Sequence, residues 1–179
     1  MKRISLPLIC ELLLFCIPLN IYCIGDYIAT GIQWALFRFQ ISETGNSLIL
    51  ASRDIFYVTS GILKGSSAIS TILWIAGTVL LIAALLLLVF STIQSDARPV
   101  RPAGYLTIVS GILFLCAMLA QYGLTLHNIH GYAIPFGIPV VIVTGIWCAT
   151  GAATGRTDDA SPPDPENGEK SPENPGPGE

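Results

Sequence analysis

Residues 70–90 contain no charged side chain, and this stretch constrains the fold more than any other. The run reads STILWIAGTVLLIAALLLLVF. As an α-helix rising about 1.5 Å per residue, it is long enough to cross the hydrocarbon core of a bilayer, which is about 30 Å thick. Helices buried in soluble proteins usually keep a polar face, and residues 79–89 have none. We therefore expect a transmembrane helix here.

The composition of the whole chain also indicates a membrane protein. Of its 179 residues, 52% are hydrophobic and 12% are charged, and the mean hydropathy is +0.64. Soluble domains average about 25% charged residues. The chain lacks a basic, aromatic-rich patch of the kind that binds nucleic acid. The lipid bilayer is thus an expected partner, and nucleic acid is not.

Three further apolar runs complete a pattern of four spans. The predicted spans cover about residues 4–24, 70–90, 104–124 and 134–153, which makes residues 1–154 a four-span membrane domain. Basic residues flank the spans on one side: Lys2, Arg3, Arg98, Arg101 and Arg156. Because basic residues favour the cytoplasmic side, we expect a multi-pass protein of the cell membrane with both termini in the cytoplasm. The alternative is that residues 4–24 form a cleaved signal peptide, which would leave three spans.

The outer loop between the first two predicted spans, residues 25–69, carries strand signals. Residues 32–41 alternate in a way that predicts a strand, and residues 42–47 predict a turn. Residues 48–52 and 55–59 then resume a β-branched and aromatic pattern. We expect a small extracytoplasmic sheet of two or three strands, which must pack on the outer ends of the helices to be stable.

Three aromatic residues of this loop, Trp34, Phe37 and Phe39, are candidate contact residues. The alternative is an interfacial amphipathic segment that holds the same three side chains at the level of the lipid head groups. The chain ends in residues 155–179, which are rich in proline, glycine and acidic side chains and have no aromatic or large aliphatic residue. We expect a disordered cytoplasmic tail, because it cannot bury enough apolar surface to offset its chain entropy.

Glu11 is the only ionisable side chain well inside a predicted span. Burying its charge in lipid would cost several kcal/mol, so we expect it to face the bundle and find a polar partner or to be protonated. The available partners are hydroxyl groups such as those of Thr78, Ser110 and Thr144, backbone carbonyls or water. Glu11 is therefore the intramembrane polar candidate, with a carboxylate that reaches back to the head groups as the structural alternative.

Other residues point to packing rather than chemistry. Gly151 and Gly155 form a GxxxG pattern, which allows two membrane helices to approach closely. His127 and His130 lack the further ligands that a metal site needs, and the five cysteines show no CxxC spacing. We predict no metal, no cofactor and no catalytic residues, because the sequence also lacks a nucleophile triad or a phosphate-binding loop.

This layout, with Trp34 in a strand-like first outer loop, resembles that of the claudin and tetraspan group. Claudins carry a tryptophan followed by two cysteines in that loop, whereas residues 25–69 contain no cysteine. The resemblance implies architecture only, and no functional residue is transferred.

The expected fold is an all-α integral membrane protein, a four-transmembrane-helix bundle with a small, partly β extracytoplasmic loop. The expected function is that of a non-enzymatic structural or interaction protein, which contacts membrane proteins or a second copy of itself through its first outer loop and its tail. The alternative is a small transporter or channel component with Glu11 in a polar path.

Overall fold

The computed structural model describes residues 6–25, 28–94, 98–128 and 131–150. In chain order the elements are α1 (Leu6–Leu14), β1 (Asn20–Ile24), β2 (Ala29–Gln33), β3 (Phe37–Ser42), β4 (Gly45–Leu50), α2 (Ala51–Thr59), α3 (Gly65–Gln94), α4 (Val100–Tyr122), β5 (His127–Asn128), β6 (Gly131–Ile134) and α5 (Ile138–Ala149). The all-α prediction is wrong, because the described part of the chain holds an antiparallel sheet of order β4-β3-β2-β1-β6-β5 beside its helices.

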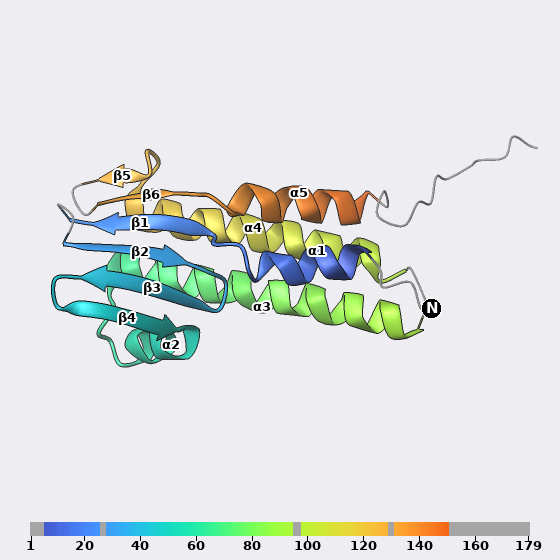
Figure 1. Ribbon diagram of the computed structural model, residues 1–179, viewed down its shortest axis with the longest axis horizontal. Helices are drawn as coiled ribbons and strands as arrows, with labels where there is room; N and C mark the ends of the chain where they lie inside the picture. The colour runs from blue at the N-terminus through green and yellow to red at the C-terminus, as the bar shows by residue number, and fades with distance from the viewer. Residues whose placement is uncertain (1–5, 26–27, 95–97, 129–130, 151–179) are drawn as a thin grey trace, which may run out of the picture.

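The two long helices, α3 and α4, run side by side along the length of the molecule (Figure 1). The sheet lies along one half of this pair, and α1 and α5 lie along the other half. Strand β1 follows α1, and strand β6 precedes α5. Each of these two segments of the chain is therefore a helix in one half of the molecule and a strand in the other (Figure 1). The half that contains the sheet is called the sheet half below, and the other the helical half.

Helices α3 and α4 are long and apolar enough to cross a membrane. Helix α3 has 30 residues and includes the whole predicted span 70–90. Helix α4 has 23 residues and covers most of the predicted span 104–124. The longest apolar runs were thus located correctly, because length and lack of charge are the strongest signals for such helices.

The other two predicted spans are not single helices. In residues 4–24, helix α1 ends at Leu14 and residues 20–24 form strand β1. In residues 134–153, helix α5 begins at Ile138 after strand β6. An apolar run cannot by itself distinguish a helix from a strand with both edges paired, and β1 is such a strand, between β2 and β6.

The outer loop is also corrected in two places. Residues 32–41 are not one strand, because β2 ends at Gln33 and β3 begins at Phe37. Tertiary hydrogen bonds hold the intervening turn: the indole of Trp74 donates to the carbonyl of Trp34 over 3.2 Å, and the hydroxyl of Thr78 donates to the carbonyl of Ala35 over 2.7 Å. Residues 55–59 belong to helix α2 and not to a strand.

Two features of the outer loop are confirmed. A tight turn between β3 and β4 falls within the predicted turn 42–47, where Ser42 pairs with Gly45. The sheet packs on α3 and α4 within the sheet half, as its stability requires. Buried Tyr22 and Ala35 from the sheet half share one apolar core with Trp74, Phe114 and Met118 from α3 and α4.

The helical half buries polar groups and exposes apolar ones. Glu11, Thr107 and Ser110 are at most 1% exposed. Large apolar side chains such as Leu86 and Val143 are more than 60% exposed. This pattern is opposite to that of a soluble domain, where charged groups are almost never fully buried.

Glycines allow α4 and α5 to pack backbone against backbone. A Cβ atom on Gly104 would lie 2.7 Å from the carbonyl oxygen of Gly145, and a Cβ on Gly145 would lie 2.9 Å from that of Gly104. Small residues thus mediate this helix contact, as is common in membrane proteins. The predicted pair Gly151 and Gly155 and the predicted tail, residues 155–179, lie outside the described residues.

Candidate functional site

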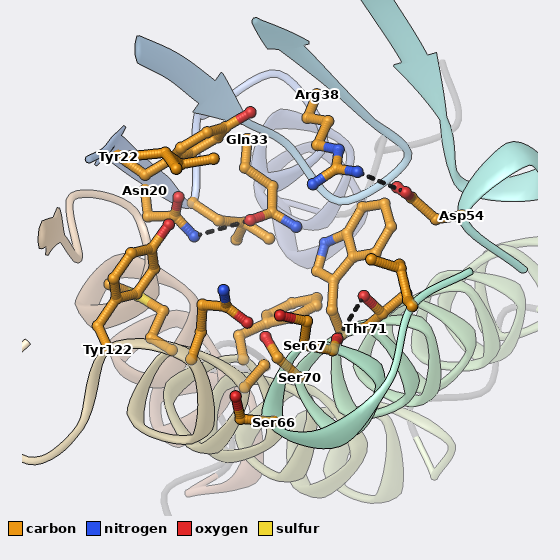
Figure 2. Close-up of a pocket in the computed structure, with 18 of the residues that line it drawn as sticks. Asn20, Tyr22, Gln33, Arg38, Asp54, Ser66, Ser67, Ser70, Thr71 and Tyr122 are labelled. Atoms are coloured by element: carbon orange, nitrogen blue, oxygen red, sulfur yellow. Dashed lines mark hydrogen bonds and ion pairs between the residues drawn. The ribbon is translucent and has the colours of Figure 1, made fainter. Parts of the chain in front are cut away.

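A cavity of about 470 Å³ lies between the sheet and the parts of α3 and α4 that belong to the sheet half (Figure 2). Sites that bind small molecules commonly have volumes of about 300–1,000 Å³. One wall comes from strands β1, β2 and β3, and the opposite wall comes from α3 and α4, with α2 at the side. We call this space the seam cavity, because it lies where the sheet meets the helices.

The sheet wall presents a row of polar side chains from three neighbouring strands. Asn20 of β1 pairs in register with Gln33 of β2, and Gln33 pairs with Arg38 of β3. Since side chains directly opposite each other in a sheet share a face, all three reach the cavity. The side-chain amide of Asn20 donates to the Oε1 atom of Gln33 over 3.1 Å.

A second row depends on a glycine. Tyr22 pairs in register with Gly31, and Gly31 pairs with Gln40. Because Gly31 has no side chain, the ring of Tyr22 lies over it, and the Tyr22 hydroxyl donates to Gln40 Oε1 over 3.4 Å. Burial raises the pKa of Tyr22 above its usual value, so its hydroxyl keeps its proton at neutral pH.

Arg38 forms an ion pair with Asp54 of helix α2 at the side of the cavity (Figure 2). The distance from Nη2 of Arg38 to Oδ1 of Asp54 is 2.6 Å. Asp54 is 2% exposed and Arg38 is 24% exposed. Burial raises the pKa of Asp54, and the positive charge of Arg38 opposes that shift in part. The two charges cancel, so the pair leaves this wall formally neutral.

The helix wall combines hydroxyl groups with an apolar floor. Ser67, Ser70 and Thr71 come from the first turns of α3 and lie across the cavity from Asn20 and Gln33 (Figure 2). The floor is formed by buried apolar side chains of the two long helices: Trp74, Phe114, Ala117 and Met118. The cavity therefore has a polar side and an apolar side.

Two buried atoms of the sheet wall have no hydrogen-bond partner among the described residues. They are Oδ1 of Asn20, a residue that is 5% exposed, and Nε of Arg38. Buried polar groups in proteins are almost always hydrogen-bonded, so each exception needs an explanation. Here one acceptor and one donor remain unsatisfied in the wall of the cavity.

Glu11 forms a separate polar site in the helical half. The hydroxyl of Thr107 donates to its Oε1 atom over 2.9 Å and also lies 3.1 Å from the carbonyl oxygen of Ala103. The Oε2 atom of Glu11 has no partner among the described residues. The expectation of a buried, hydroxyl-bonded carboxyl group is confirmed, although Thr107 supplies the hydroxyl and not Thr78, Ser110 or Thr144.

The aromatic residues predicted from the outer loop lie away from the seam cavity. The rings of Trp34 and Phe37 stack with centroids 4.9 Å apart, and the Trp34 indole donates to the carbonyl of Cys16 over 3.1 Å. Phe39 lies on the other face of the sheet from its neighbours Arg38 and Gln40. Their predicted role as contact residues remains a prediction.

Sequence reasoning missed the seam cavity, because its walls join positions about 50 to 100 residues apart. Asn20 and Tyr22 lie two positions apart, as do Arg38 and Gln40, so each pair places polar groups on one face of a strand. This spacing was the signal in the sequence that could have indicated a polar wall. Comparison of the chain with protein-family models and with curated proteins finds no match. The described residues contain no group of three or more His, Cys, Asp or Glu side chains that could hold a metal ion.

Proposed function

We propose that this chain is a non-enzymatic, multi-pass protein of the cell membrane that acts through contacts made by its extracytoplasmic sheet. In this proposal the chain crosses the bilayer four times, with both termini in the cytoplasm and the acidic tail, residues 155–179, as a second contact segment. The helical half supports a membrane location, because it exposes apolar side chains and buries Glu11 and Thr107.

The two short helices support four crossings only together with the residues next to them. At about 1.5 Å per residue, α1 and α5 rise about 14 and 18 Å, which is less than the hydrocarbon thickness. The chain next to them continues with exposed side chains of low polarity, among them Cys16 and Phe136. The residues that join α1 to β1 and β6 to α5 would thus complete the two crossings.

The proposal of a contact function rests on a row of apolar side chains across the outer face of the sheet, which is the face opposite the seam cavity. The register joins five strands through the residues Ile134, Ile21, Ile32, Phe39 and Leu48, which we call the outer-face row. Ile134, Ile21 and Leu48 are 42–57% exposed. A contiguous exposed apolar surface is typical of protein or membrane contact sites.

Strand β4 makes a second copy of the chain a suitable partner. It is the last strand of the sheet, and five of its six residues are exposed. Its sequence, GNSLIL, contains no lysine or proline, the residues that commonly protect an edge strand from pairing with another chain. Leu48 belongs both to this edge and to the outer-face row, so one contact would cover both.

Self-association tests this proposal. We expect the protein to occupy nanodiscs as dimers or larger assemblies, and we expect Leu48→Lys to make it monomeric, because a charge would be buried in the contact. Single-molecule photobleaching of a C-terminal fluorophore counts the copies in each disc. Ile28→Lys is the matched control, since Ile28 is 60% exposed and lies outside the outer-face row. A monomeric wild-type protein, or an unchanged Leu48→Lys variant, would contradict the proposal.

A second candidate function is that of a transporter or channel component with Glu11 in a polar path. The observation in its favour is the Oε2 atom of Glu11, which is buried and has no partner among the described residues. Intramembrane carboxyl groups of this kind often belong to proton or ion pathways. Such a role would be lost on replacement of Glu11 by Gln, which cannot release a proton.

A further inference from the structure

We propose that the seam cavity is a binding site for a neutral, hydroxyl-rich group, such as a sugar or another polyol, either free in water or as the head group of a lipid. This site is separate from the outer-face row, because the cavity lies on the opposite face of the sheet. It would therefore exist whether or not the protein self-associates.

The unpartnered atoms of the wall select for groups that both donate and accept hydrogen bonds. Oδ1 of Asn20 needs a donor, and Nε of Arg38 needs an acceptor. A hydroxyl group can serve as either. Leaving a buried polar atom without a partner costs about 1–3 kcal/mol. Both atoms are almost fully covered, so a ligand gains this free energy once the two side chains rotate slightly towards the cavity.

The charges of the wall select against an ionised ligand. The cavity lining contains one basic and one acidic side chain, Arg38 and Asp54, and these already pair over 2.6 Å. A phosphate or carboxylate would have to compete with Asp54 for the guanidinium, and an ammonium group would have to compete with Arg38 for the carboxylate. A neutral ligand does not compete for either charge, so the pair can remain intact.

The opposite wall completes the match to a polyol. Hydroxyl groups of Ser67, Ser70 and Thr71 face the amides of Asn20 and Gln33 across the cavity (Figure 2). The aromatic side chains of Tyr22 and Trp74 also line it, and the C–H face of a sugar ring can pack on such apolar surfaces. The floor at Phe114 and Met118 offers an apolar surface on which a short alkyl chain can pack if the head group belongs to a lipid.

Native mass spectrometry of the full-length protein in a sugar-free detergent tests the site. The probes are D-glucose and octyl glucoside for the neutral class, with octyl phosphate and octyltrimethylammonium as charged counterparts of equal chain length. We expect one neutral probe to bind with a stoichiometry of one and more tightly than either charged probe. Binding of glucose itself indicates an aqueous ligand, whereas binding of octyl glucoside alone indicates a lipid.

Two variants assign the binding to the cavity. Ser70→Phe fills it and is expected to weaken binding at least about tenfold, whereas Ser52→Phe on the exposed surface of α2 is the control and should bind as the wild type does. Gln40→Glu keeps an oxygen for the Tyr22 hydroxyl but adds a negative charge. It should raise the binding of octyltrimethylammonium relative to octyl glucoside by about tenfold.

The proposal is overturned if neither neutral probe binds, which would mean that water alone fills the cavity. It is also overturned if the charged probes bind as tightly as the neutral ones. If Ser70→Phe does not fold, the Gln40→Glu variant decides: an unchanged preference among the probes would show that they bind elsewhere.

Discussion

Replacing Arg38 by Met is expected to lower the free energy of unfolding by about 3–5 kcal/mol at neutral pH, because it leaves the buried carboxylate of Asp54 without its positive partner. The cost arises from Asp54, which is 2% exposed, and not from Arg38, which is 24% exposed. Thermal unfolding of the protein in detergent, followed by circular dichroism, measures the loss.

The pH dependence of this loss has a definite sign. Burial already raises the pKa of Asp54 in the folded protein, and removal of Arg38 takes away the charge that opposes the shift. A carboxyl group with a raised pKa stabilises the fold at pH values below its unfolded pKa, and that contribution is lost as the pH rises through the folded pKa. The Arg38→Met variant should therefore approach the wild type near pH 4 and fall further below it as the pH rises to 7.

Two further variants control this experiment. Arg53→Met removes an exposed arginine from the same region, whose guanidinium carbon lies 5.6 Å from the ring centroid of Tyr57, and should cost less than about 1 kcal/mol. Replacing Arg38 by Met and Asp54 by Leu together should restore most of the stability, because no charge then remains buried. A single Arg38→Met variant that is equally destabilised at pH 4 and pH 7 would contradict this explanation.

Replacing Glu11 by Ala should destabilise the helical half by roughly 2 kcal/mol or more, whereas Glu11→Gln should stay within about 1 kcal/mol of the wild type. The hydroxyl of Thr107 has one proton and two oxygen neighbours, Oε1 of Glu11 and the carbonyl of Ala103. A glutamine amide can donate to Thr107 Oγ1, which frees that proton for Ala103, and it fills the same volume. Thermal unfolding measures both variants.

The same Glu11 variants separate the two proposed functions. If the protein acts by contacts, vesicles that contain the wild type or Glu11→Gln should show the same proton flux as empty vesicles, measured with a pH-sensitive dye. Glu43→Gln, which changes an exposed carboxylate in the turn between β3 and β4, is the control. A wild-type flux that Glu11→Gln removes and Glu43→Gln retains would favour the transporter alternative.

The sequence predicted the parts of the fold in which one local property decides the structure. The long uncharged runs predicted the central part of α3 and most of α4, and residues 42–47 predicted a turn. The helix–strand boundary after Leu14 was not predictable, because the apolar run continues through both elements. There the choice is made by hydrogen bonds from β1 to β2 and β6, which lie far away in the sequence.

The candidate sites show the same division between local and distant information. The burial of Glu11 followed from the cost of a charge in an apolar run, and the structure confirms it. Its partner Thr107 lies 96 positions away in the sequence. The sequence alone could not identify Thr107 among the several hydroxyl groups of the other predicted spans. The ion pair of Arg38 and Asp54 was missed because residues 55–59 were interpreted as a strand, whereas helix α2 brings Asp54 beneath the sheet.

The most direct test of the membrane arrangement is labelling of single introduced cysteines in intact cells with a membrane-impermeant maleimide. Thr44→Cys places the probe in the exposed turn between β3 and β4, and Gln94→Cys places it at the opposite end of α3. We expect Thr44→Cys to be labelled in intact cells, above the level of the wild type with its own five cysteines. Gln94→Cys and a C-terminal epitope should become accessible only after permeabilisation. Labelling of Gln94→Cys from outside, or equal labelling of both positions, would contradict the account.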